Sequence, residues 1–255
     1  MKRLLTLSAI VLGLALQAGN VSASAFRVTP IRVTLDRSGA SALLTLSNES
    51  KDTLRFQISA FHWSQDPAGL MQLEPTEDIL FFPALLSLEP GSERKVRVSA
   101  KTAAGAVEKT YRIFFEELPS LATAGATQGA QVRILTKMGV PIFVAPQTVT
   151  EKAIISNARV EGGKIRFDVR NEGTVRFAVQ GVKLRGVDAN DSTVFEHQLD
   201  GWYVLAGTAR TYEFALPAED CSRLKSVMIA AQTDSVSEGA AAATSRVEIP
   251  AAGCR

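Results

Sequence analysis

The chain has 255 residues, a formal net charge of +2 and two cysteines. That length fits two domains of ordinary size, each able to bury a core of its own. The near balance of charge argues against a nucleic-acid surface, which needs a basic excess gathered on one face.

The N-terminus has the layout of a secretory signal peptide. Lys2 and Arg3 precede an apolar run, and Ala23-Ser24-Ala25 fits an A-x-A cleavage site. The alternative, a retained amphipathic anchor, is disfavoured because the apolar core is short for a membrane span. We therefore expect a signal peptide over residues 1–25 and an exported chain whose charges balance, since cleavage leaves 28 − 2 = 26 basic residues against 26 acidic ones.

Short runs of alternating hydrophobicity, separated by turn residues, dominate the sequence from Phe26 onward. The predicted strands are 42–48, 54–63, 94–100, 110–118, 131–146, 164–171, 175–186, 208–216, 225–233 and 245–250. No convincing amphipathic helix follows the leader. Many short strands at this spacing indicate an all-β chain of antiparallel β-sandwiches. We place the boundary near Pro146, giving domains at 26–148 and 149–255.

Two segments of the chain resemble each other. SNESKDTLRFQI (47–58) and RNEGTVRFAV (170–179) each end a strand in Asn-Glu, make a tight turn and restart with an apolar-Arg-Phe triplet. Two sandwiches of related build would produce this pattern. Coincidence is the alternative, because Asn at the end of a strand is common turn chemistry.

The two cysteines, Cys221 and Cys254, lie in the last 35 residues. In an oxidising export compartment such a pair favours a disulfide, for which the chain-entropy model predicts roughly 3–4 kcal/mol. A zinc or thiol-redox site is a poor alternative, because no CxxC occurs and His62 and His197 are far away in the sequence. We expect no metal and no cofactor.

The same two histidines offer little support for an enzyme. A hydrolytic triad needs Ser, His and Asp to converge, and neither neighbourhood contains a GxSxG motif. Asp188, Asn190 and Asp191 lack the Gly and the bidentate Glu of an EF-hand loop, so a hairpin turn is the better interpretation. No nucleotide-binding motif occurs. We expect a protein that is not an enzyme.

The stretch QVRILTKMGVPIFVAP (131–146) carries two apolar rows. One face carries Val132, Ile134, Met138, Val140, Ile142 and Val144, whereas Leu135 and Phe143 point to the other. An ordinary strand buried in its own domain and a strand kept for a partner would both give this pattern, because periodicity does not distinguish a core from an intermolecular surface.

Several motifs together resemble the periplasmic pilus-assembly chaperones of the PapD-like family. They are FRVTPIRVTLDRSGASALLTLSNES, FFPALLSLEPGSERKVRVS (81–99), YRIFFEELP and VPIFVAP. The resemblance covers residues 26–150 well and the remainder loosely. Its overall look is closest to the branch that assembles archaic, spore-coat-U-like pili.

The resemblance implies two immunoglobulin-like β-sandwich domains and a periplasmic location. It also implies donor-strand complementation, in which a strand of the first domain completes an unfinished pilus subunit. The chaperone then passes the subunit to an outer-membrane usher, without ATP. The implied donor row is Val132, Ile134, Thr136, Met138 and Val140, with Leu135 and Phe143 packing inward. An unoccupied row of this kind also favours self-association of the free protein.

The resemblance further implies a basic cleft that binds the carboxylate at the C-terminus of the subunit. Arg32 falls on the family's first basic position, and a charge-assisted grip suits arginine. The family's lysine position falls on Pro141, so Arg112 and Lys137 are possible substitutes. An ordinary solvated charge is the alternative for Arg32. The alternative for the whole chain is an exported structural or adhesive protein of pilin-like build.

Overall fold

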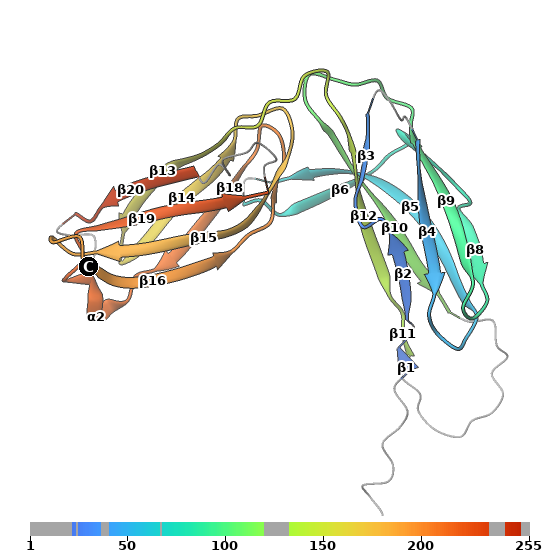
Figure 1. Cartoon of the computed structure of the whole chain (residues 1–255), viewed down its shortest axis with the longest axis horizontal. Coiled ribbons are helices and arrows are strands. Elements are labelled where there is room, and N and C mark those ends of the chain that lie inside the picture. The colour runs from blue at the N-terminus through green and yellow to red at the C-terminus, as the bar shows by residue number, and fades with distance from the viewer. Residues whose placement is uncertain are drawn as a thin grey trace, which may run out of the picture.

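A computed structural model describes residues 22–23, 25–36, 41–66, 68–119, 133–234 and 243–250. Strands make up nearly all of the regular structure in these ranges, and they gather into two lobes that meet at an angle (Figure 1). None of the helical structure in the same ranges has the length and hydrophobicity needed to span a membrane. The all-β prediction is therefore confirmed.

The first lobe is a sandwich of two sheets. Its strands are β2 (Phe26–Thr29), β3 (Val33–Leu35), β4 (Ser41–Asn48), β5 (Leu54–Gln65), β6 (Met71–Pro75), β7 (Ile79–Phe82), β8 (Leu85–Leu88), β9 (Glu93–Ala100), β10 (Lys109–Leu118) and β12 (Lys137–Val144). One sheet has the order β3-β12-β10-β5-β6, with β8 also paired to β5, and the other has the order β2-β4-β9-β7. Alternate residues of both sheets, such as Leu44, Phe56, Val96 and Ile113, are fully buried between them.

The second lobe is also a sandwich. Its elements are β13 (Ala153–Glu161), β14 (Lys164–Asn171), β15 (Phe177–Val187), β16 (Thr193–Asp200), β17 (Tyr203–Val204), β18 (Ala209–Ala215), α2 (Ala218–Cys221), β19 (Ser226–Thr233) and β20 (Ala243–Glu248). The sheet β13-β14-β18 faces the sheet β16-β15-β19-β20, in which β17 also pairs with β15. In β14 the alternation KIRFDVRN buries Ile165, Phe167 and Val169 and turns the charged residues outward.

A small sheet lies outside both sandwiches. β1 (Ser22–Ala23) pairs in parallel with β11 (Arg133–Ile134). The predicted cleavage after Ala25 would remove β1 and leave β11 without this neighbour. The long strand predicted over 131–146 is thus divided, because Leu135 and Thr136 separate β11 from β12.

The nine other predicted strands are all found. Among the strands that were missed, β13 and β16 have identifiable causes. β16 has no fully buried residue, so its sequence lacks the alternation that marks a strand. β13 contains a register shift between Ser156 and Arg159, where Asn157 has a positive φ of 53°, and a bulge of this kind interrupts the alternation. The predicted boundary at 148/149 falls between β12 and β13 and stays a prediction.

The internal sequence echo corresponds to equivalent hydrogen bonds in the two lobes. Asn48 is buried, and its Nδ2 donates to the carbonyls of Asp52 (2.8 Å) and Leu88 (3.0 Å). Asn171 is also buried, and its Nδ2 donates to the carbonyls of Val175 (2.8 Å) and Val204 (3.0 Å). Each side-chain oxygen also accepts the N–H two residues further on. Coincidence is therefore a poor account of the echo.

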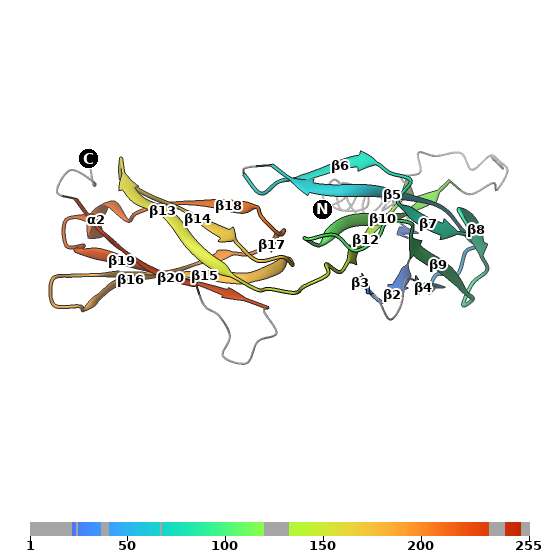
Figure 2. The same cartoon turned by 90° about the horizontal axis from the view of Figure 1, so that it is seen from above.

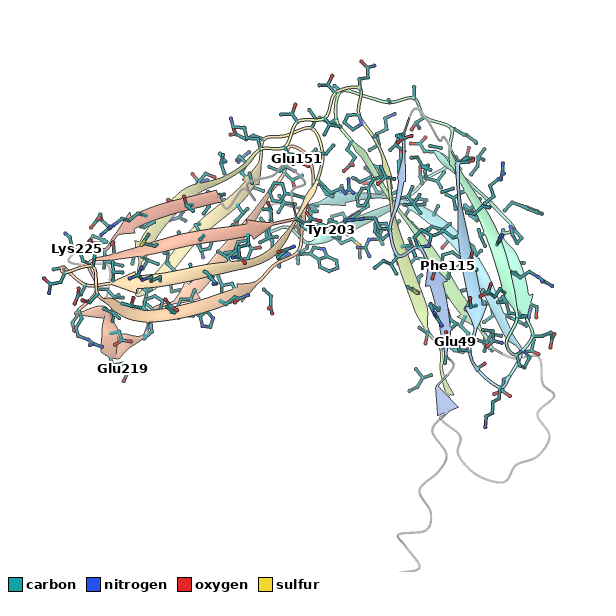
Figure 3. The ribbon with its side chains drawn as sticks, viewed as in Figure 1. Glu49, Phe115, Glu151, Tyr203, Glu219 and Lys225 are labelled. Carbon is teal, nitrogen blue, oxygen red and sulfur yellow. The ribbon has the colours of Figure 1, made fainter. Side chains whose placement is uncertain are left out.

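A third apolar cluster joins the lobes. This interlobe cluster contains Trp63, Phe143, Leu205, Leu73 and Tyr203. The β5–β6 hairpin reaches toward the second lobe (Figure 2). Near its tip, Gln65 donates through Nε2 to the Tyr203 carbonyl (2.8 Å) and accepts the Leu205 N–H (2.9 Å). Tyr203 lies where the two lobes meet (Figure 3).

Candidate functional site

The edge of β12 that faces β3 is largely uncovered in the part of the chain that the structure describes. On its other edge, β12 pairs with β10 from Lys137 to Val144. β3 pairs only with residues 142–144. The N-terminal half of β12 therefore presents backbone groups that another strand can pair with, as exposed sheet edges do.

An apolar row leads along this free edge and changes from exposed to buried. Ile134 is 48 % exposed, Thr136 and Met138 are partly buried, and Val140 is 0 % exposed. Val140 differs from the expected donor row, because it belongs to the core of the first lobe together with Ile142. Val132 lies outside the described residues. In the described chain, the accessible part of the row thus runs from Ile134 to Met138.

The second apolar row of the segment, Leu135 and Phe143, also departs from expectation. Leu135 is exposed rather than packed inward. Phe143 is fully buried, but in the interlobe cluster instead of the core of the first lobe. Gly139 lies under the ring of Phe114, where a Cβ atom would come within 2.6 Å of Cε1. This face of β12 is therefore directed toward the second lobe and the surface beside it.

Two arginines flank Pro141 in one row across the sheet. Arg112 on β10 is paired in register with Pro141 on β12. On the other side Val33 pairs in parallel with Ile142, which places Arg32 beside Pro141. Strands two places apart are separated by about 10 Å. Because Val33 and Ile142 point into the core, the row of Arg32, Pro141 and Arg112 points to the opposite face. On that face Arg32 contacts Asp234 and Arg112 contacts Trp202 of the second lobe, and this junction of the lobes is called the cleft below.

Arg32 makes an ion pair across the cleft. Its Nη1 lies 3.4 Å from Oδ2 of Asp234, which follows β19 in the second lobe. The other carboxylate oxygen, Oδ1, accepts the N–H of Ala178 (2.6 Å). Both side chains are partly exposed, so the attraction between them is partly screened by solvent.

Arg112 is half-buried and has no acidic partner among the described residues. Its Cζ lies 4.5 Å from the ring centroid of Trp63 and 5.8 Å from that of Trp202. Its Nε atom is buried and makes no hydrogen bond there. Burial lowers the pKa of the Arg112 guanidinium, and the nearby Tyr203 opposes that shift. A guanidinium in this state is suited to an anion supplied from outside.

Lys137 lies away from this row. It is four residues from Pro141, or about 13 Å along a strand. Its Nζ pairs with Oε2 of Glu116 at 2.9 Å and lies 5.0 Å from the ring centroid of Phe114. Of the two substitutes considered for the missing lysine, the geometry places Arg112 in the cleft and Lys137 at the far end of β12.

A buried ion pair fixes the lobes beside the cleft. Arg176 of the second lobe donates through Nη1 to Oε1 of Glu108 (2.6 Å), and its backbone N–H donates to Oε2 (3.0 Å). Glu108 is about 1 % exposed through its side chain. Burial raises the pKa of the Glu108 carboxyl, although Arg176 acts in the opposite direction. The Arg176 guanidinium also lies 3.8 Å from the ring centroid of Phe143.

The two histidines lie in different lobes. His62 packs on Tyr111, and His197 packs on Phe214 in the other lobe. Asp188 accepts the N–H groups of Asn190 and Ser192, as the predicted hairpin turn requires. The described ranges contain no cluster of potential metal ligands. Cys221 is buried and Cys254 lies outside the described residues, so their disulfide stays a prediction.

Sequence reasoning missed four residues of the cleft. Glu108, Arg176, Trp63 and Trp202 come from segments far apart in the chain. Neither the ion pair of Glu108 with Arg176 nor the contacts of the two tryptophans with Arg112 produce a periodic pattern in the sequence. Trp63 and Trp202 carried one signal, since they are the two tryptophans of the chain.

Comparison with known proteins gives this arrangement a family. Residues 25–150 match the model of the pili and flagellar-assembly chaperone family, PapD N-terminal domain. No curated protein matches the chain by sequence.

Solved chaperone structures share the fold of nearly the whole chain. One such structure is the chaperone CsuC in complex with the tip adhesion subunit CsuE, from archaic chaperone-usher Csu pili of Acinetobacter baumannii. It is 17 % identical to this chain, with a TM-score of 0.57, and the match covers 88 % of this chain and 98 % of that one. The YadV chaperone is 12 % identical with a TM-score of 0.58, covering 87 % and 98 %. The SafB chaperone in complex with the SafA pilin of Salmonella enterica is 14 % identical with a TM-score of 0.53, covering 90 % and 99 %.

These likenesses confirm the prediction of two immunoglobulin-like sandwiches. The family match in the first lobe also favours a chaperone over the alternative of a pilin-like structural protein. The chain belongs to the PapD-like family of pilus-assembly chaperones.

Proposed function

We propose that this chain captures an incomplete pilus subunit by lending it the strand that begins before β12. The free edge of β12, continued by the exposed Ile134, is the observation that carries the proposal. Strand addition satisfies the unpaired backbone groups of the subunit, while alternate side chains fill its open core. A subunit left without this strand exposes an apolar groove and a sheet edge, and both promote aggregation.

The donor row in this proposal is Val132, Ile134, Thr136 and Met138. Val140 is excluded, because its side chain fills the core of the first lobe and has no surface left to offer. The burial of Val140 holds the end of the donor strand that is next to the first lobe. A strand that is held at one end loses less conformational entropy on binding than a free loop does.

The anchor for the carboxylate of the subunit is Arg112, with Arg32 as a second cation. Arg112 has no acidic partner among the described residues to displace, and its burial strengthens a charge-assisted hydrogen bond. Arg32 would have to share its charge with Asp234. Lys137 is not part of the anchor in this proposal, because Glu116 holds it at the far end of β12.

The partners and the location follow from the family. The similar chaperones CsuC and SafB are each in complex with a pilus subunit. We infer that this chain, of the archaic-like branch, also serves a pilus subunit and delivers it to an outer-membrane usher. It acts in the periplasm after loss of residues 1–25, with no enzymatic step and no cofactor. Domains at 26–148 and 149–255, and a disulfide between Cys221 and Cys254, complete the proposal.

Co-expression with an exported pilus subunit tests this function. The full chain, tagged at its C-terminus, should retain the subunit as a soluble one-to-one complex in a periplasmic extract. The control is the same subunit expressed alone, which should aggregate or be degraded. A subunit that stays equally soluble without the chain, or that never co-purifies with it, would contradict the proposed function. Incorporation of the chain itself into fibres would instead support a structural role.

A further inference from the structure

The guanidinium of Arg112 contacts two tryptophans that belong to different lobes. Trp63 lies on β5 of the first lobe, and Trp202 directly precedes β17 of the second. Both ring centroids lie within 6 Å of the guanidinium carbon, at 4.5 Å and 5.8 Å. This is the range in which a cation is attracted to an aromatic face. Arg112, a cation of the first lobe, is thus in contact with one aromatic ring from each lobe.

Arg112 differs in this respect from the two other arginines of the cleft. Arg32 and Arg176 each have an acidic partner, whereas no ion pair of Arg112 occurs within the described ranges. Aromatic faces offset part of the hydration that a half-buried guanidinium loses. They contact the face of the guanidinium, so the N–H groups in its plane stay available to a ligand. An acidic neighbour would offset the same loss but would compete with an incoming carboxylate.

The position of Trp202 is fixed by its neighbours in the chain. Its carbonyl accepts the N–H of Val179 (2.9 Å). Gly201 approaches the same segment so closely that a Cβ atom would lie 1.7 Å from the Val179 oxygen. On the other side, Tyr203 packs edge-on against Trp63, with ring centroids 5.5 Å apart. Trp202 is 45 % exposed, so its ring is accessible to a bound protein chain.

We propose that Trp202 is a positioning residue for the anchor, through which the second lobe holds the Arg112 guanidinium in place for the terminal carboxylate of a bound protein chain. This inference rests on the proposed function. It gives the second lobe a part in client binding, although the donor strand belongs to the first. The affinity for the carboxylate then depends on the orientation of the two lobes relative to each other.

A double-mutant cycle on the complex with a co-expressed pilus subunit tests the proposal. The measured quantity is the dissociation rate of the purified complex for Trp202→Ala, Arg112→Gln and the double variant. We expect Arg112→Gln to raise the rate about tenfold or more. Trp202→Ala should raise it about three- to tenfold, and the double variant should not exceed Arg112→Gln alone. Residues that act through one another are non-additive in this way.

Two further variants separate positioning from general loss of structure. Trp202→Phe keeps an aromatic face and should dissociate at nearly the wild-type rate. Met228→Ala removes a similarly exposed apolar side chain from β19 of the second lobe and should have no effect. An unchanged rate in Trp202→Ala, or effects of Trp202→Ala and Arg112→Gln that add fully, would overturn the inference while leaving the proposed function intact. Failure of the wild-type chain to hold the subunit would overturn both.

Discussion

Arg112 on β10 is the register partner of Pro141 on β12. A cation therefore lies one strand away from the position where the family resemblance predicts a lysine. Proline at 141 places no charge in the cleft. The neighbouring strand supplies the charge instead, on the same face of the sheet and at the same level. A carboxylate that binds between Arg32 and Arg112 would lie over Pro141, close to where the lysine would have bound it.

Ile134→Asp should abolish subunit capture with little effect on the stability of the free chain. Ile134 is about half exposed, so the free chain loses little buried apolar surface, whereas a carboxylate cannot enter the apolar groove of a subunit without a large desolvation cost. The matched control is Leu135→Asp, which changes a similarly exposed neighbour on the opposite face. Co-purification and the urea midpoint are measured for both. Capture by Ile134→Asp, or equal losses in the two variants, would count against this donor row.

Arg112→Gln should weaken capture by about 1.5–3 kcal/mol, the usual contribution of a hydrogen bond to a charged group. Lys137→Gln should leave affinity nearly unchanged, because Lys137 is exposed and paired with Glu116. Arg32→Ala should have an intermediate effect, since Arg32 is shared with Asp234. Competition with a subunit that ends in a carboxamide is the decisive measurement. If wild type and Arg112→Gln discriminate equally between the two subunit termini, Arg112 is not the anchor.

Arg176→Met should destabilise the chain by roughly 3–5 kcal/mol, because it leaves the buried Glu108 carboxylate without its cation. The cost should shrink at low pH, where protonation of Glu108, whose pKa burial already raises, removes the charge. A second change, Glu108→Gln, should recover much of the lost stability. The control is Lys225→Met, which removes an exposed pair with Glu248 worth about 0–1 kcal/mol. Equal unfolding midpoints for Arg176→Met and Lys225→Met would refute this role of the pair.

Glu213 should make the second lobe sensitive to acid. Hydrogen bonds from Lys164 and Arg166 lower the pKa of its carboxyl from 4.5 to about 2. A depressed carboxyl pKa contributes stability above the unfolded value of 4.5, and that stability is lost as the pH falls from there through about 2. Glu213→Gln should therefore flatten the decline of the unfolding free energy in this window. Parallel declines in wild type and variant, measured by urea unfolding at several pH values, would show that the group contributes nothing.

The class of the fold, and the position of those strands that show clear alternation, could be predicted from the sequence alone. Alternation in segments such as KIRFDVRN fixes which side chains enter a core, because a strand repeats every two residues. The sequence also revealed the related turns around Asn48 and Asn171, because each asparagine bonds to residues only two to four positions away as well as to a neighbouring strand.

The contacts of each apolar row from Ile134 to Val144 depend on the tertiary structure. Val140 and Ile134 have the same parity and similar hydrophobicity, yet one is sealed in the core and the other is exposed, because the first sandwich ends between them. The cleft was equally beyond the reach of periodicity. Arg112, Trp63 and Trp202 become neighbours through strand pairing and the meeting of two lobes, which are contacts between distant segments that no local pattern records.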